Sequence, residues 1–470
     1  SRERTRVTDM SEQKRPLSRK GEVNAHSALT QEASLPAEPI DRVVNPIARF
    51  LHVESAGGVV LLLATAAALL LANSPVSEDF LSLWKTPVGF SVGAFEMRHS
   101  LKHWINDGLM VIFFFVVSLE VKRELILGEL RELRVAALPI AAALGGMVAP
   151  AALYLAFQWG EAAQHGWGIP MATDIAFVVG CMALLGPRVP GSLRVLLLSL
   201  AIADDVGAIL VIAIGYTAEL SVTALAWTVL GIGLMMFLQR IGVRNLGIYV
   251  LLGVGIWFGF HESGVHATIA GVVLGLLTGV KPWVSQSLLI QFVQQLGGVL
   301  QGDSRHDTHQ RQALLQSVET AVRKSISPME RLEAALHPWV SFVIMPLFAF
   351  ANAGVPIAAG AFTDSVAMAI VVGLCVGKPV GIVLFSWFAV RTGLAKLPEG
   401  VSWGILAAGG VLAGIGFTMS LFIAGLALSE PLLLAAKIGI LTGSVLSAVL
   451  GLALLLWLLP KPAQAGSAAA

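Results

Sequence analysis

The chain has 470 residues, of which 56% are hydrophobic and 13% are charged, and its mean hydropathy is +0.78. The charged share is about half the roughly 25% of an average soluble domain. This composition excludes a soluble globular enzyme and indicates an all-α polytopic membrane protein whose main partner is membrane lipid. A formal net charge of +1 gives no indication of a nucleic-acid partner, and we expect none.

The chain begins with a polar stretch. Residues 1–45 have mixed charge and contain neither an apolar run nor the hydrophobic segment of a signal peptide, so we expect a disordered cytoplasmic tail. Residues 46–460 are then expected to form the membrane domain, and residues 461–470 a short C-terminal tail.

About twelve apolar runs follow the tail, and each predicts a helix that crosses the bilayer. When the runs alternate from a cytoplasmic N-terminus, nearly all Lys and Arg residues fall on the cytoplasmic side, and both termini lie there. The exceptions are Lys85, Arg98, Lys102 and Lys437 outside and Lys378 within a run. The runs cover residues 56–73, 101–120, 135–159, 167–186, 191–216, 222–239, 245–260, 264–280, 337–355, 366–390, 402–427 and 431–459.

Two segments outside the membrane have patterns of their own. In residues 84–98, apolar side chains recur with a period of two and Gly93 supplies a turn, which predicts a short external β-hairpin. Its strand edges are suited to pairing across a two-fold axis, so we expect a homodimer through the hairpin. Residues 281–335 are polar and predict a cytoplasmic loop that is partly helical near residues 311–335.

Two adjacent carboxylates, Asp204 and Asp205, lie in the middle of an apolar run. An ionised carboxylate at the bilayer centre costs about 2.5–3.5 kcal/mol even on lenient insertion scales. A polar contact between helices would need only a single Asn, so the pair predicts a cation or proton site. Adjacent positions on a helix are about 100° apart, and we therefore expect the two carboxylates to point in different directions.

Two of the runs are interrupted by Gly and Pro. Residues 166–174 read Gly-Trp-Gly-Ile-Pro-Met-Ala-Thr-Asp, and residues 409–419 read Gly-Gly-Val-Leu-Ala-Gly-Ile-Gly-Phe-Thr-Met. The second stretch also fits plain GxxxG packing. Because the interruptions occupy matching places in two groups of three runs, we favour broken helices in a transporter built from inverted-topology repeats.

A lysine and an acidic residue accompany these breaks. Lys378 lies inside an apolar run and is too central to reach the interface easily, so its expected partner is a carboxylate within the membrane. Asp174 lies beside Thr173 at the first break. Broken helices leave partial charges at their facing ends. We expect Asp174 to offset the positive N-terminal ends and Lys378 the negative C-terminal ends.

Other polar residues lie near the ends of the runs. Asn106 and Asp107 are either a helix cap or part of the path by which ions enter. Glu120, Arg123 and Glu124 are spaced so that they can contact one another on one helical face near the cytoplasm.

Taken together, nine motifs resemble the bacterial NhaA sodium/proton antiporters, and they occur in family order across residues 50–455. The motifs are Ile105-Asn-Asp-Gly-Leu-Met110, Leu119-Glu-Val-Lys-Arg-Glu124, Met171-Ala-Thr-Asp-Ile-Ala-Phe177, Leu200-Ala-Ile-Ala-Asp-Asp-Val-Gly-Ala208, Gly264-Val-His-Ala-Thr268, His337-Pro-Trp-Val340, Phe348-Ala-Phe-Ala-Asn-Ala-Gly354, Gly377-Lys-Pro379 and Gly414-Ile-Gly-Phe-Thr-Met-Ser420.

The resemblance implies a fold with two broken, crossing helices in the bacterial inner membrane. It implies a transporter, not an enzyme, that exchanges Na⁺ or Li⁺ for H⁺ by alternating access and needs no cofactor. The Na⁺ site would consist of Asp204 and Asp205, supported by Thr173 and Asp174, with Lys378 close by. Carboxylate oxygens suit a hard cation and can hold protons instead, so competition between the two would couple their movement.

The resemblance also implies regulation by pH at the cytoplasmic face. The matching positions are Glu120, Arg123, Glu124, Arg331, Glu333 and His337. The chain departs from the family at Glu330 and Ala334, where a Lys and a His are expected.

Two alternatives remain. A sodium-coupled symporter could use the same scaffold. An intramembrane aspartyl protease also uses two membrane aspartates, but its Gly-x-Gly-Asp motif is missing from the sequence and its aspartates lie on separate helices.

Overall fold

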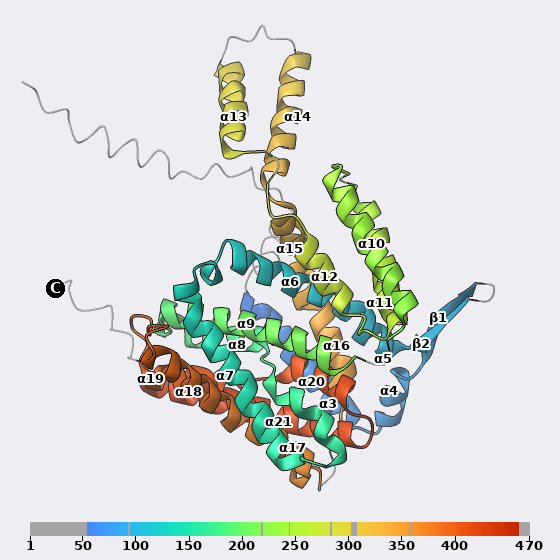
Figure 1. The fold of residues 1–470 in the computed structure, drawn as a ribbon, viewed down its shortest axis with the longest axis vertical. Coiled ribbons are helices and arrows are strands. Elements are labelled where there is room, and N and C mark those ends of the chain that lie inside the picture. Colours follow the sequence, from blue (N-terminus) through green and yellow to red (C-terminus); the bar gives the residue numbers. More distant parts are fainter. Residues whose placement is uncertain are drawn as a thin grey trace, which may run out of the picture. The chain divides into compact units, whose positions relative to one another are not determined.

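The computed structural model describes residues 54–92, 95–217, 220–243, 245–282, 284–301, 308–357 and 360–459. All of them belong to one compact unit, Leu51–Ala470, and most are helical (Figure 1). The predicted tails, residues 1–45 and 461–470, lie outside the described residues.

The structure places helices in each of the predicted apolar runs. In chain order, the elements that occupy the runs are α3 (Glu54–Ala72), α5 (Leu101–His103), η1 (Trp104–Leu109), α6 (Met110–Ile126), α7 (Leu133–Gln158), η3 (Ala162–Met171), α8 (Ile175–Leu185), α9 (Gly191–Gly215), α10 (Val222–Arg240), α11 (Leu246–Ser263), α12 (Ile269–Leu277), α15 (Pro328–Trp339), η5 (Val340–Ile344), α16 (Met345–Asn352), α17 (Ser365–Val372), η7 (Gly373–Gly377), α18 (Lys378–Arg391), α19 (Trp403–Ala413), α20 (Phe417–Ala427) and α21 (Leu432–Leu458).

The number of membrane spans is lower by length and composition than the twelve expected. Among the described residues, seven helices are long and apolar enough to cross a bilayer, and two bent helix pairs bring the number to nine. Among the remaining runs, helix α12 has only 9 residues. The all-helical membrane architecture is therefore confirmed, whereas the count of twelve is not.

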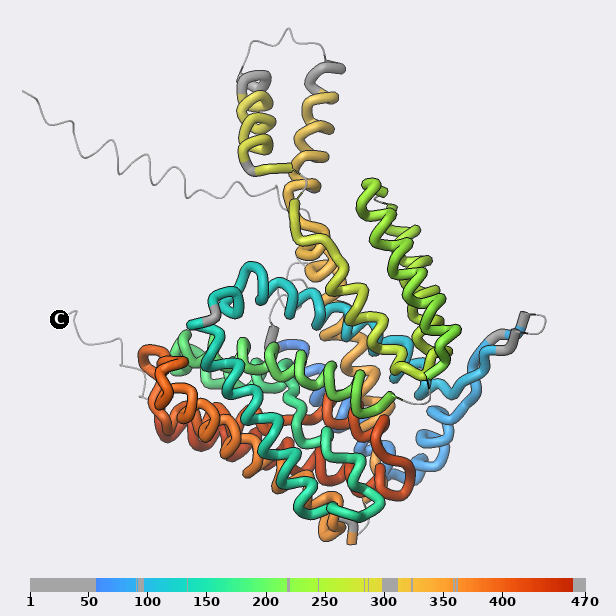
Figure 2. Tube along the Cα trace, in the orientation of Figure 1, coloured from blue at the N-terminus to red at the C-terminus, as the bar shows by residue number. Residues whose placement is uncertain are grey.

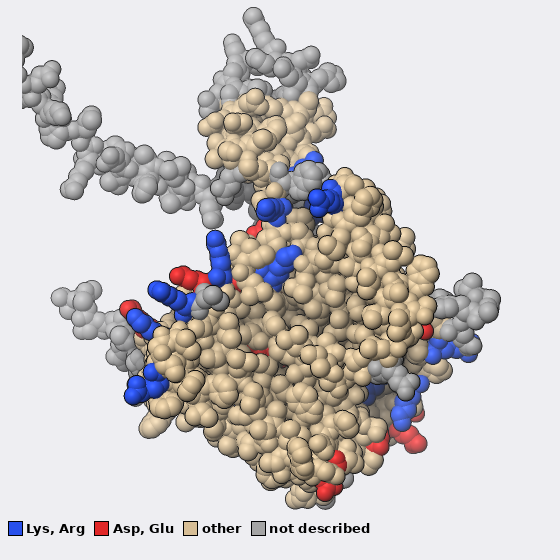
Figure 3. Space-filling view, in the orientation of Figure 1, with Lys and Arg blue, Asp and Glu red and all other residues tan. Residues whose placement is uncertain are grey.

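Charge and apolar surface follow the pattern of a protein in lipid. On the face shown in Figure 3, Lys and Arg gather toward the upper left with a few Asp and Glu among them, charged residues of both signs lie at the lower right, and the area between is almost uncharged. Helix α10 exposes Val222, Trp227, Val229 and Leu230. A helix that is apolar on all sides and exposed to this extent fits a hydrocarbon environment rather than water.

Close packing of α7 against α18 forms one side of the core, and the two helices lie side by side in Figure 2. Gly145 and Gly381 face each other, and a Cβ on either would collide with the backbone of the other. Small residues allow such close approach in membrane helices. The contact brings α7 beside the start of α18, where a Cβ on Gly146 would be 3.8 Å from Cε of Lys378.

The predicted hairpin is present. Strands β1 (Pro87–Val92) and β2 (Phe95–Ser100) pair antiparallel, with Pro87 opposite Ser100 and Val92 opposite Phe95. The hairpin therefore begins and ends slightly later than the predicted residues 84–98, and a short helix α4 (Ser77–Leu83) precedes it. Gly93, the expected turn residue, lies outside the described residues.

The long polar segment is more helical than expected. Besides α14 (Thr308–Ser325), which lies in the region expected to be helical, it contains α13 (Gln286–Gln301), which packs against α14. The signal was present in the sequence, because Leu289, Phe292, Val293 and Leu296 recur at helical spacing. The prediction of a loop with helix only near residues 311–335 was thus incomplete.

Candidate ion-binding site

The two broken helices meet at their breaks. The axis bends by 41° between η3 and α8 and by 50° between α19 and α20. The backbone N–H of Asp174 donates to the carbonyl of Ile415 over 2.7 Å, and the Thr173 hydroxyl oxygen lies 3.2 Å from the carbonyl oxygen of Ala413. Each break thus satisfies backbone groups that the other leaves open, which is how irregular backbone is tolerated at membrane depth.

The Asp174 carboxylate lies at the N-terminal ends of both α8 and α20. Its Oδ1 accepts from the backbone N–H of Phe177 over 3.2 Å, which makes Asp174 the N-cap of α8. Its Oδ2 accepts from the backbone N–H of Thr418 over 3.2 Å and from the Thr418 hydroxyl. A negative charge at two helix N-termini offsets their partial positive charges, as expected from the sequence.

Lys378 lies at the first position of α18, directly after the π-helical turn η7. Its side chain is completely buried. The ammonium donates to the backbone carbonyl of Met171, the last residue of η3, and to Oδ2 of Asp204 over 2.8 Å. It therefore lies at a helix C-terminal end and beside a membrane carboxylate, and both contacts match what its position in the sequence predicted.

Asp204 is the point at which three helical segments converge. Its Oδ2 accepts two hydrogen bonds, one from Lys378 and one from the Thr173 hydroxyl over 2.6 Å. Its Oδ1 is buried and has no hydrogen-bond partner among the described residues. A buried carboxylate oxygen without a donor is costly, and a cation or a proton at Oδ1 would remove that cost.

Asp205 follows on the same helix, α9, and is 5% exposed. It makes no hydrogen bond or ion pair with any side chain in the described part of the chain. Asp204 is thus held by Thr173 and Lys378, whereas Asp205 is buried without such partners. These different contacts agree with the expectation that the two carboxylates point in different directions.

Near the hairpin end of the protein, Asn106 and Asp107 both have partners. They lie in the π-helical turn η1. Asn106 and the buried Asn352 exchange amide hydrogen bonds, of which the one from Asn352 Nδ2 to Asn106 Oδ1 is 2.8 Å. Oδ2 of Asp107 lies 3.4 Å from Nε2 of His103. Neither side chain accepts a hydrogen bond from a backbone N–H of the described residues, which argues against the helix-cap alternative. Their place on the path by which ions enter stays a prediction.

At the other end of α6, an ion pair joins two of the residues assigned to pH regulation. Nη1 of Arg123 lies 2.5 Å from Oε1 of Glu333, whose side chain is only 10% exposed. The pair links α6 to α15. Glu124 has a different partner: its Oε1 accepts a hydrogen bond from the backbone N–H of Glu129 over 2.8 Å.

The other members of this group lie on the same two helices. Glu120 precedes Arg123 by one turn of α6, and on α15 Arg331 is exposed and His337 half-buried. Glu330, which departs from the family pattern, has a structural role. It forms a capping box with Ser327, in which each side chain bonds the other's backbone N–H. The Ser-Pro-Met-Glu spacing that signals this cap is visible in the sequence.

Sequence reasoning missed two residues of the site. Thr418 holds Asp174, and Asn352 holds Asn106. Both stand inside motifs that carry the family resemblance, but neither is charged. An isolated Thr or Asn in an apolar run is compatible with many roles, so the only signal was its place beside a break or at a helix end.

Comparison with known proteins agrees with this arrangement. Residues 48–455 match the profile described as Na+/H+ antiporter 1. The chain belongs to this family. It is similar to Na(+)/H(+) antiporter NhaA of Rhodopirellula baltica, with 53% identity over 92% of this chain and 98% of that protein. Similar proteins from Rhizobium meliloti, named Na(+)/H(+) antiporter NhaA, and Acidiphilium cryptum, named Na(+)/H(+) antiporter NhaA 2, are 52% and 51% identical over 89% and 90% of this chain, and over 95% of each relative.

Membership of the family has direct consequences. The protein is a transporter rather than an enzyme, which excludes the aspartyl protease alternative, and the ions of such an antiporter are substrates, so no cofactor is required. It is a multi-pass protein of the bacterial inner membrane, embedded in lipid.

Proposed function

We propose that this protein exchanges Na⁺ or Li⁺ for H⁺ across the inner membrane, and that Asp204 and Asp205 are the carboxylates for which the ions compete. The observation that carries the proposal is the buried Asp204 carboxylate, with one oxygen held by Thr173 and Lys378 and the other without a donor. A hard cation prefers oxygen ligands. Because the same oxygens accept protons, one site serves both ions at different times.

Alternating access follows from the position of this site at the crossing of two broken helices. Sites of this kind lie near the bilayer midplane, and rearrangement of one group of helices opens them to one side at a time. Twelve spans with both termini in the cytoplasm would place the hairpin outside and α13 and α14 inside. The distribution of Lys and Arg supports this orientation.

Electrogenic exchange requires unequal numbers of protons and sodium ions. The site contains three groups that can carry protons, namely Asp204, Asp205 and Lys378, so it could release more than one proton for each sodium ion that binds. Regulation by pH would act through the Arg123–Glu333 pair and the nearby His337, which interacts electrostatically with Glu333. The β1–β2 hairpin would pair with a second copy to form a homodimer.

The proposal is tested with purified protein in proteoliposomes that contain no organic solute. An outward sodium gradient should drive proton uptake into the lumen, and lithium should replace sodium. A symporter of the same fold would move no protons under these conditions until a solute is added. Proton movement that is unaffected by sodium or lithium would overturn the proposal.

A further inference from the structure

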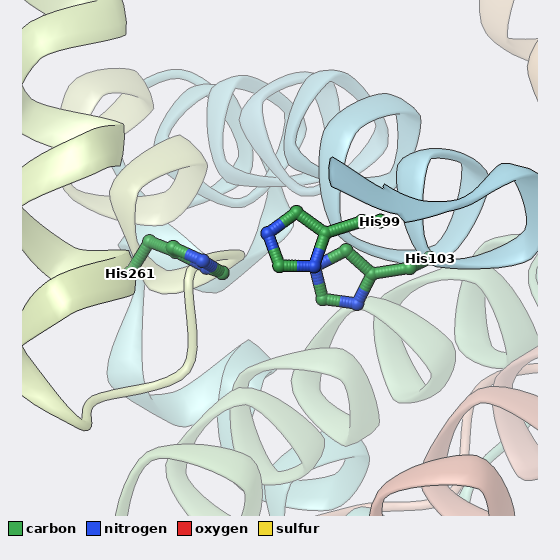
Figure 4. A group of neighbouring side chains, drawn as sticks. All are labelled: His99, His103 and His261. Atoms are coloured by element: carbon green, nitrogen blue, oxygen red, sulfur yellow. The ribbon is translucent and has the colours of Figure 1, made fainter. Parts of the chain in front are cut away.

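Three histidines meet near the base of the hairpin, outside the carboxylate site. His99 lies in β2, His103 ends α5, and His261 lies near the end of α11. Figure 4 shows His261 reaching from α11 toward the neighbouring rings of His99 and His103. One ring nitrogen of each residue lies within 4.8 Å of the other two.

The three rings are held by aromatic neighbours. The rings of His99 and His103 stack with centroids 4.2 Å apart, and His261 stacks on Trp257 at 5.8 Å. Trp257 in turn stacks on Trp104, whose indole N–H donates to the carbonyl of Val88 over 2.8 Å. The cluster is thus positioned by packing on both of its sides, which limits the cost of fixing the rings around a ligand.

We propose that His99, His103 and His261 bind one divalent transition-metal ion, with Zn²⁺ as the best match. Neutral imidazole nitrogen suits Zn²⁺, and three His ligands with a fourth position for water form a known type of zinc coordination. Nitrogens about 2.0–2.1 Å from a tetrahedral zinc lie about 3.3 Å apart. From the observed spacing, each pair of rings must close by at most about 1.5 Å.

Asp107 strengthens the site. Its Oδ2 lies 3.4 Å from Nε2 of His103 and its side chain is 16% exposed. A carboxylate beside a metal-binding imidazole orients the ring and raises its affinity for the cation. Sodium is a hard cation that prefers oxygen, so this nitrogen-rich cluster is chemically distinct from the carboxylate site at Asp204 and Asp205.

A metal ion here would join two parts of the fold that have separate cores. Met235, Ile256, Phe260 and Ala270 form a small core of their own among α10, α11 and α12. His99 and His103 belong instead to the hairpin and α5. A bound ion would connect α11 to β2 and α5, and binding to the folded state alone stabilises that state.

The test titrates metal-free protein in detergent with Zn²⁺, after removal of any histidine tag. His306 and His309 of the long polar segment are replaced by Gln in every sample, so that their spacing of three residues cannot contribute a second site. The parent should bind one Zn²⁺ per chain. His99→Gln and His261→Gln should each weaken binding at least about 10-fold, because even a change behind a ligand costs this much.

The matched control is His165→Gln, which removes an exposed histidine of η3 outside the cluster. It should bind Zn²⁺ as the parent does. Zn²⁺ should raise the Tm of the parent and of His165→Gln, but not that of His261→Gln. The Tm of each variant without zinc shows whether it folds. Failure of the parent to bind at millimolar Zn²⁺, or undiminished binding by folded His99→Gln and His261→Gln, would overturn the proposal.

Discussion

The Lys378 ammonium donates a 2.8 Å hydrogen bond to Oδ2 of Asp204, and both side chains are almost completely buried. Lys378 also donates to the carbonyl of Met171, at the end of a broken helix. One buried amine therefore links α18 both to the Asp204 carboxylate and to the helix crossing. Because the Lys378 amine makes both contacts, a Lys378 variant can change both the stability of the protein and the net charge moved per sodium ion. The two effects therefore need separate measurements.

Lys378→Gln should destabilise the protein, because it leaves the Asp204 carboxylate buried without its counter-charge. Breaking one partner of a buried ion pair costs about 3–5 kcal/mol. The measurement is the Tm in detergent. Lys378→Gln/Asp204→Asn serves as the control and should recover part of the loss, since no unpaired charge remains. A Tm of the single variant equal to that of the parent would contradict the account.

The same variant tests whether Lys378 carries a proton. If it does, any exchange that remains in Lys378→Gln should move less net charge per sodium ion, and its reversal potential in proteoliposomes with fixed gradients should differ from that of the parent. An unchanged reversal potential would make Lys378 a structural counter-charge and leave the aspartates as the only proton carriers.

Asn106 is predicted to act mainly through its amide pairing with Asn352. Asn106→Ala leaves the buried Asn352 side chain without this partner, and an unsatisfied buried polar group costs about 1–3 kcal/mol. Asn106→Ala should therefore lower the Tm while leaving the sodium concentration for half-maximal exchange nearly unchanged. The double variant with Asn352→Ala should cost less than the sum of the two single ones. A large change in sodium dependence with an unchanged Tm would instead place Asn106 on the path of the ions.

Glu333 and His337, at the predicted cytoplasmic face, should influence the pH profile of exchange. Glu333→Gln weakens the 2.5 Å contact with Arg123, and His337→Ala removes the nearby imidazole. Each should shift the midpoint of the profile more than it changes the maximum rate. Glu330→Gln is a graded control, because this exposed carboxylate caps α15 and acts on Glu333 only through its charge, so its shift should be smaller than that of Glu333→Gln. A profile that is unchanged in both variants would argue against this face as the sensor.

The β1–β2 hairpin should be required for the protein to form a homodimer. Deleting residues 87–100 and joining the ends with a short flexible linker should give monomers that still exchange sodium, because the strands contribute no residue to the carboxylate site. Analytical ultracentrifugation in mild detergent gives the oligomeric state. A dimer that persists after the deletion would mean that the interface lies elsewhere.

The sequence was sufficient to predict those parts of the site whose chemistry is costly in lipid. Asp204, Asp205 and Lys378 stand out because charge in an apolar run requires a reason, and the breaks stand out because Gly and Pro interrupt otherwise continuous runs. Their mutual contacts follow from the need for neutralisation. The structure brings Asp204 and Lys378 together as this reasoning expected, and it places Thr173 beside Asp204 as the family resemblance implied.

Other features depend on contacts between distant residues that carry no such cost. Thr418 and Asp174 are far apart in the chain, as are His261 and His99, and only the tertiary structure brings them together. Helix α13 was missed for a different reason. Its apolar residues recur at helical spacing, but the segment as a whole is polar, and that composition is also typical of a loop.

The most direct test of the account is sodium-driven proton flux in proteoliposomes that contain Asp205→Asn, with Asp204→Asn measured in parallel. Asn keeps the size of the side chain but removes the charge for which sodium and protons compete. The account predicts folded proteins, judged by Tm and monodispersity, with no sodium-dependent proton flux. Full exchange by Asp205→Asn would contradict the assignment of this carboxylate pair as the ion site.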